Sequence, residues 1–218
     1  MKKLLALTMA LVLCLGLAAC GGDTTTEEST DTQQASGETV TLKVGATPAP
    51  HQEILEQVVD VLAEQGITLE IVPYNDYVAP NTAVEEGVDD ANFFQHITYM
   101  DNFNAERGTH LVNAGAIHYE PMGIYAGKSD SLENIPDRAV IAIPNDATNE
   151  GRALLLLQDL GLLTLKEDAG LEATPKDIAE NPHNLQFKEL EAAMLPQTID
   201  EVDFSIINSC LLYTSDAA

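Results

Sequence analysis

The chain alternates short apolar runs with longer segments in which apolar residues recur every three or four positions. After the run at 40–44 come Pro48 and Pro50, then apolar residues at helical spacing from about 51 to 65, and then Gly66. A short apolar run predicts a buried strand, helical spacing predicts an amphipathic helix, and glycine is a common helix stop. This stretch therefore predicts a strand, a turn and a helix.

The same alternation continues to residue 208. The predicted strands are 40–44, 69–72, 88–92, 111–116, 118–125, 140–143, 185–190 and 203–208. The predicted helices are about 51–65, a short helix ending at Gly87, 96–107, 129–134, 149–160 and a short one that opens at Thr174. Strands alternating with helices are typical of α/β folds with open sheets. Because the pattern restarts after Lys128, we predict two lobes, 39–125 and 126–208.

The segment 139–158 contains the strongest candidate for ligand binding. An apolar strand leads through a polar loop into a helix, for which Thr148 is the predicted N-cap and Arg152 lies in the first turn. A cation there opposes the helix dipole, so a nearby anion is expected to compensate. Helix amides and a guanidinium together suit a carboxylate ligand. The alternative is a structural ion pair between Arg152 and a carboxylate of the protein.

The N-terminus has the pattern of a bacterial lipoprotein. Lys2 and Lys3 precede an apolar run at 4–17, which is too short to span a bilayer, and Ala18 and Ala19 lead directly to Cys20. We predict a signal peptide at 1–19 that is cleaved before a lipidated Cys20. The alternative is an ordinary signal peptide followed by a chance cysteine. Residues 20–38 lack large apolar side chains and are expected to form a disordered tether.

Charge and cysteine content narrow the class of protein. Ten Lys and Arg against 35 Asp and Glu give a net charge of −25, which repels nucleic acid and anionic lipid. With Cys14 in the signal peptide and Cys20 acylated, only Cys210 is left, so no internal disulfide is expected. The sequence thus indicates an extracytoplasmic protein that contacts the membrane through its lipid anchor.

Polar and aromatic residues gather directly after the predicted strands, where open α/β sheets bind ligands. They are Thr47, His51, Tyr74, Tyr77, Asn92, Phe93, Phe94, Gln95, His96, Tyr99, Asn145, Asn149, Arg152 and Asn208. One fixed cation, several amides and many aromatic rings suit a small zwitterion with an apolar side chain. We expect Arg152 to bind its carboxylate.

Neither a metal site nor catalysis is expected from local spacing. His51, His96 and His118 form no pair with metal-like spacing, and no cysteine supports them. The sequence has no nucleophile elbow and no glycine-rich phosphate loop, and Glu120 near His118 is at best a weak acid/base pair. We therefore predict a non-enzymatic protein without a cofactor.

Several motifs resemble the methionine-binding lipoproteins of ABC importers. They are KVGATP at 43–48, DANFFQH at 90–96, EPMG at 120–123, IPNDATNEGRALLLL at 143–157, ENP at 180–182 and ELEAA at 189–193. The resemblance covers about 41–208. It implies a type II periplasmic-binding-protein fold, with two α/β lobes around a ligand cleft.

The resemblance also implies ligand, site and partners. The ligand would be L-methionine or a close analogue, and the partners an ABC permease and its ATPase, served by a monomer that is lipid-anchored on the extracytoplasmic face of the cell membrane. The residues that match the family's ligand contacts are Tyr77, Phe94, His96, Tyr99, Asn149, Arg152 and Asn208.

Residues 209–218 depart from the family's continuation after Asn208. We hypothesise that this tail is not native and that the C-terminal part of the fold is missing. The chain would then lack part of the first lobe and part of its ligand shell, and the second lobe would be incomplete. A chain of this kind is expected to fold less stably and to bind more weakly than a complete one.

Other ligands and roles stay open on sequence alone. Within the same class, the ligand could be D-methionine, oxidised methionine or a methionine-containing dipeptide. Outside it, the chain could be a zinc receptor, or a surface lipoprotein for adhesion or sensing.

Overall fold

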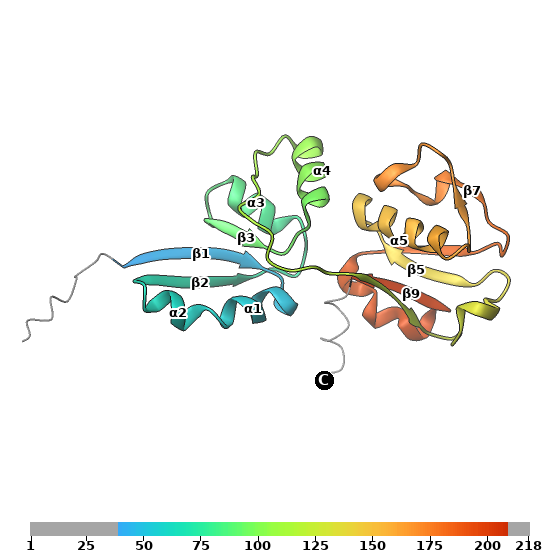
Figure 1. The fold of residues 1–218 in the computed structure, drawn as a ribbon, viewed down its shortest axis with the longest axis horizontal. Coiled ribbons are helices and arrows are strands. Elements are labelled where there is room, and N and C mark those ends of the chain that lie inside the picture. Colours follow the sequence, from blue (N-terminus) through green and yellow to red (C-terminus); the bar gives the residue numbers. More distant parts are fainter. Residues whose placement is uncertain (1–38, 209–218) are drawn as a thin grey trace, which may run out of the picture. The chain divides into compact units, whose positions relative to one another are not determined.

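Two larger β-sheets and a small two-stranded one, with flanking helices, make up residues 39–208, the part of the chain that the computed structural model describes (Figure 1). The predicted signal peptide, Cys20 and the tether lie outside the described residues, as does the tail at 209–218. The alternation of strands and helices confirms the α/β class.

The first sheet is parallel and has the order β2-β1-β3, formed by Ile67–Pro73, Val40–Ala46 and Ala91–Phe93. Its register aligns Ala46 with both Pro73 and Phe93, so all three strands end at one edge. The segments that follow these strands are therefore brought together, as the sequence analysis assumed. The third strand begins three residues later than predicted and is shorter.

The predicted helix at 51–65 is divided. A short π-helical turn η1 (Pro48–Gln52) precedes α1 (Glu53–Glu56) and α2 (Val59–Ala63), and α2 lies along β2 (Figure 1). At the break, the backbone amides of Gln57 and Val58 bond to the carbonyls three residues before them. Such bonds tighten the turn and interrupt the α-helical pattern.

Two further helices flank the first sheet. The short α3 (Ala79–Glu85) follows β2, and α4 (Ile97–Arg107) follows β3. His96 is the N-cap of α4, and Gly108 ends it with a φ of 68°, a conformation that glycine adopts without strain. These bounds confirm the predicted helix at 96–107.

The predicted strand at 111–116 does not form. Residues 108–121 carry no helix or strand, and β4 begins only at Met122, four residues after the predicted start at 118. Val112 is 85% exposed and Ile117 is 69% exposed, so the apolar side chains that suggested strands are in solvent. We refer to 108–121 as the α4–β4 connection.

The second sheet is mixed and has the order β4-β9-β5-β8. Its strands are Met122–Ala126, Phe204–Asn208, Val140–Pro144 and Gln186–Leu190, and only the β4–β9 pair is antiparallel. The predicted lobe boundary at 125/126 falls inside β4. All described residues belong to one compact unit, and the division into two lobes stays a prediction.

Smaller elements complete the second half of the chain. The strands β6 (Thr164–Leu165) and β7 (Ile178–Glu180) form an antiparallel pair that the sequence analysis missed. The 3-10 turns are η2 (Leu132–Asn134), η3 (Gly170–Glu172), η4 (Pro175–Asp177), η5 (Ala192–Met194) and η6 (Pro196–Glu201). The turn η2 is shorter than the predicted helix at 129–134, and η4 has Thr174 as its N-cap, as predicted.

The long helix α5 (Ala147–Asp159) packs beside β5 and contributes most to the larger core. Ala153, Leu154 and Leu157 are fully buried against Ile141 and Ile143 of the strand. Its N-cap is Asp146, whose carboxylate accepts the Asn149 amide at 3.1 Å, so the prediction of Thr148 was wrong by two residues. Among the described helices, none is both long and apolar enough to span a bilayer.

Candidate ligand-binding site

Three of the predicted site residues form one aromatic group. The rings of Tyr77 and Phe94 are stacked with centroids 5.7 Å apart, and Tyr99 meets both edge-on at 6.0 and 6.1 Å. The Tyr99 hydroxyl donates to the backbone carbonyl of Tyr77 at 3.0 Å, and its burial raises the pKa of that hydroxyl. The group is therefore a fixed apolar wall in which the Tyr99 hydroxyl has a hydrogen-bond partner.

Three more predicted residues form a polar group centred on Asn149. Its side-chain oxygen lies 2.8 Å from the Arg152 guanidinium and 3.3 Å from the His96 ring, while its amide nitrogen donates to both carboxylate oxygens of Asp146. This pattern fixes which end of the amide is oxygen, because only oxygen accepts from Arg152. The cap of α5 and the polar group thus share Asp146.

The tautomer of His96 follows from its two partners. Its Nδ1 accepts from the Tyr99 backbone amide at 3.2 Å, so in the neutral ring Nε2 carries the proton and donates to Asn149. Burial lowers the pKa of His96, and the positive charge of Arg152 lowers it further. Both effects favour the neutral ring near pH 7.

Arg152 is held by neutral oxygens. Besides the Asn149 side chain, the guanidinium donates to the backbone carbonyl of Glu120 at 3.1 Å. No side-chain carboxylate within residues 39–208 forms an ion pair with it, so the alternative of a structural ion pair finds no support there. The sequence predicted Arg152 in the first turn of the helix. Because α5 begins at Ala147, Arg152 lies in the second turn instead.

A cavity of about 450 Å³ adjoins both groups. Tyr77, Tyr99 and Asp146 line it, together with Asn145 and Ala192 from the second half of the chain. It is the size of a typical small-molecule site, in which apolar walls carry a few polar groups. The cavity therefore connects the aromatic wall to the cap of α5.

Asn208, the seventh predicted residue, forms no side-chain hydrogen bond with the other six within residues 39–208. It ends β9 opposite Met122, two residues beyond the Glu120 carbonyl that Arg152 contacts. Its side chain is 8% exposed, and its Oδ1 has no hydrogen-bond partner among the residues that the structure describes. A buried acceptor of this kind can accept a hydrogen bond from a ligand.

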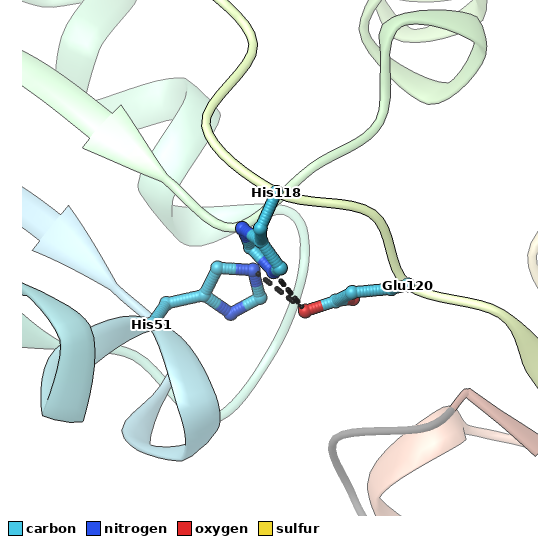
Figure 2. A group of neighbouring side chains, drawn as sticks. All are labelled: His51, His118 and Glu120. Carbon is cyan, nitrogen blue, oxygen red and sulfur yellow. Dashed lines mark hydrogen bonds and ion pairs between the residues drawn. The ribbon is translucent and has the colours of Figure 1, made fainter.

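A third group, which the sequence did not predict, is formed by His51, His118 and Glu120, and we call it the histidine–glutamate cluster. Figure 2 shows both rings directed at one carboxylate oxygen, Oε1 of Glu120, which lies 3.2 Å from Nε2 of His51 and 2.6 Å from Nε2 of His118. Burial alone would raise the pKa of Glu120, but the hydrogen bonds from the two histidines outweigh it and lower the pKa to about 2. No local signal reveals this cluster, because His51 is far from the other two in sequence.

Glu150, next to Asn149 in α5, leads to a prediction about stability and pH. Burial, then the charges of Glu189 and Asp146, raise its pKa from 4.5 to about 7. Stability from this residue is therefore present below pH 4.5 and is lost as the pH rises through 7. We expect Glu150→Gln, which cannot ionise, to raise the free energy of unfolding on the order of 1–3 kcal/mol at pH 8 and very little at pH 4.

Urea unfolding at the two pH values measures this difference. The control is Glu167→Gln, a change on the exposed surface that is expected to leave both values unaltered. An equal effect of Glu150→Gln at pH 4 and pH 8 would contradict the proposed cause.

Parallel and mixed sheets flanked by helices, with a cavity lined by aromatic and polar side chains, suit an α/β protein that binds a small ligand. The model of the NlpA lipoprotein family matches residues 42–217. The chain therefore belongs to the NlpA lipoprotein family and is a substrate-binding lipoprotein, not an enzyme.

Relatives at about 40% identity agree with this assignment. The D-methionine-binding lipoprotein MetQ of Salmonella typhimurium is 40% identical over 205 residues, which cover 94% of this chain and 71% of that protein. A nutrient binding protein from Burkholderia cenocepacia, solved bound to methionine, is 41% identical with a TM-score of 0.76, over 80% of this chain and 74% of that one. An ABC transporter periplasmic substrate-binding protein from Coxiella burnetii is 36% identical with a TM-score of 0.75, over 80% and 74%. These similarities confirm the predicted resemblance and the periplasmic-binding-protein fold.

Proposed function

We propose that the protein captures methionine or a close analogue and delivers it to an ABC importer. The observation that carries the proposal is the surroundings of Arg152: a guanidinium held by two neutral oxygens and without a side-chain carboxylate partner among the described residues. The methionine-bound relative and the MetQ relative support the choice of ligand.

The charged ends of methionine match the polar groups. Arg152 binds the α-carboxylate, because a guanidinium offers two parallel donors in the geometry of a carboxylate. Asn149 orients that guanidinium and is itself held by Asp146 and His96. The buried Oδ1 of Asn208 accepts a hydrogen bond from the α-ammonium.

The apolar end matches the aromatic wall. Tyr77 and Tyr99 offer ring faces and edges to a thioether, and each sulfur–ring contact is worth about 0.3–1.5 kcal/mol. Because Tyr77 and Tyr99 also line the cavity, the side chain of the ligand has a place to enter. Phe94 is 7% exposed and stacks on Tyr77, and in this way it holds the Tyr77 ring in position for the ligand.

Delivery of methionine to the permease requires a membrane anchor and a change in the conformation of the protein. Lipidation at Cys20 would hold the protein on the extracytoplasmic face of the membrane, near the permease. Methionine would favour a ligand-closed form of the protein, because it contacts groups from both halves of the chain only there. This is the form that the permease would recognise.

Calorimetric titration of the full chain tests the ligand. We expect methionine to bind with one site per chain, and methioninol, which lacks the carboxylate, to bind at least about 100-fold more weakly, since a charged hydrogen bond is lost. Norleucine, which replaces sulfur by a methylene, is expected to bind about 3- to 10-fold more weakly.

Equal binding of methionine and methioninol would contradict the role of the carboxylate. Binding of a methionine-containing dipeptide in preference to methionine would leave the class of protein intact and change the ligand. L- and D-methionine are titrated side by side to establish the stereoisomer.

A further inference from the structure

We propose that the histidine–glutamate cluster binds a divalent transition metal ion, for which Zn²⁺ is the best match. Within residues 39–208 it is the one group of three potential ligand side chains close enough to share an ion. Its three ligand atoms all lie within 4.8 Å of one another. Figure 2 shows that the two histidine rings approach the carboxylate from different elements, η1 and the α4–β4 connection.

The distances suit a tetrahedral ion after small side-chain adjustments. Bonds of 2.0–2.1 Å from Zn²⁺ to nitrogen and oxygen place neighbouring ligand atoms about 3.4 Å apart. The His51–Glu120 distance of 3.2 Å is already close to this value, and the His118–Glu120 distance of 2.6 Å would lengthen. Three protein ligands leave a tetrahedral ion one position for water or for part of another molecule.

The ligand types select the class of metal. Two imidazoles and one carboxylate, without a thiolate, suit Zn²⁺, Ni²⁺, Co²⁺ or Fe²⁺. Ca²⁺ and Mg²⁺ prefer six or more oxygen ligands and do not match two nitrogens. The charge of −25 favours the approach of any cation.

The surroundings of His51 resemble the support that metal-bound histidines receive. The ring is buried, and its Nδ1 lies 2.6 Å from the hydroxyl of the buried Thr47. When Nε2 binds a metal, a neutral ring carries its proton on Nδ1 and donates it to such an oxygen, which fixes both tautomer and orientation. Phe93 packs edge-on against both histidines at 4.8 and 5.4 Å, which holds the rings in place.

A bound ion would fasten the α4–β4 connection to η1. The connection has exposed side chains at 112–119, and His118 and Glu120 lie at its end. The backbone carbonyl of Glu120 also accepts from Arg152, so the ion would lie beside the proposed methionine site. The two proposals remain separate, because metal binding can be measured without methionine.

Titration of the full chain with Zn²⁺, after EDTA treatment and removal of the chelator, tests the proposal. We expect one strong site per chain, and Co²⁺ in its place should give the visible absorption bands of a tetrahedral nitrogen–oxygen site. His118→Ala and Glu120→Gln should each weaken Zn²⁺ binding by at least about 100-fold, and Thr47→Val by about 10-fold. Glu120→Gln keeps the size of the side chain, so the test does not depend on one variant that fails to fold.

The matched control is His110→Ala. His110 forms an exposed pair with Glu85 at 2.9 Å, a histidine–carboxylate contact without a third ligand. We expect this variant to bind Zn²⁺ as the unaltered chain does. The proposal is overturned if the unaltered chain binds no Zn²⁺, or if His118→Ala binds it as tightly as the unaltered chain, which would make the cluster a purely hydrogen-bonded one.

Discussion

Replacing Arg152 by alanine is expected to weaken methionine binding by at least about 100-fold. Truncating one partner of a buried, hydrogen-bonded charge pair costs about 2–5 kcal/mol, much of it from the charge that is left without a partner. Here that charge is the carboxylate of the ligand. Asn149 would also lose the donor that now lies 2.8 Å from its oxygen.

Two further variants separate charge from geometry. Arg152→Lys keeps the positive charge and loses the planar pair of donors, so binding should be intermediate. Arg107→Ala removes a guanidinium that stacks on Phe103 at the C-terminal end of α4, the end opposite His96. This variant should leave methionine binding unaltered. Unchanged affinity in Arg152→Ala would mean that Arg152 serves only to join Glu120 to Asn149.

The second large effect is expected from Gly151→Ala, in α5 beside Arg152. A β-carbon on Gly151 would lie 2.0 Å from the backbone oxygen of Leu171 and 3.1 Å from the amide nitrogen of Ala173. Alanine favours a helix over glycine by about 1 kcal/mol, but a backbone clash of this depth forces η3 away from α5. We expect a net loss of about 3 kcal/mol or more in the free energy of unfolding.

Chemical denaturation measures this loss, with Gly115→Ala as the matched control. A β-carbon on Gly115 has no atom within 4 Å, and its φ is not in the left-handed region, so the change should stay within about 0.5 kcal/mol. If Gly151→Ala were as stable as the control, the close packing of η3 on α5 would not be a constraint.

The sequence predicted elements well where a pattern was both long and closed by a cap or stop. The helix at 96–107 is an example, because His96 and Gly108 mark its ends locally. The strand at 111–116 failed for the opposite reason. Its apolar residues have local β-propensity, but a strand also needs a neighbouring strand, and Val112 has only solvent beside it.

The start of α5 shows that capping signals in the sequence locate a helix start only to within about two residues. Asp146 and Thr148 are both good N-cap residues, and only the hydrogen bond from the Asn149 amide to Asp146 distinguishes them. That choice moved Arg152 from the first turn to the second. The prediction that Arg152 needs an external anion therefore rests on its actual neighbours and no longer on the helix dipole.

The predicted site residues could be found from the sequence, whereas the histidine–glutamate cluster could not. Residues after strand ends could be collected because parallel strands bring their ends to one edge, and six of the seven predicted residues do lie in two connected groups. The histidine–glutamate cluster depends on the path of an irregular connection, which no residue pattern specifies. Long-range contacts of this kind need the folded chain.

The residues that line the cavity differ in how much a substitution would cost the stability of the fold. Asp146 lines the cavity, and it also caps α5 and accepts hydrogen bonds from Asn149. Tyr99 lines the cavity and donates a hydrogen bond to the Tyr77 carbonyl. A substitution at either position is therefore expected to destabilise the fold. Asn145, Ala193 and Gln197 line the same cavity from exposed positions, and their side chains contribute no hydrogen bond within the described residues. Descendants of this protein can therefore change ligand preference through these three positions at little cost in stability, and directed evolution of the cavity should begin there.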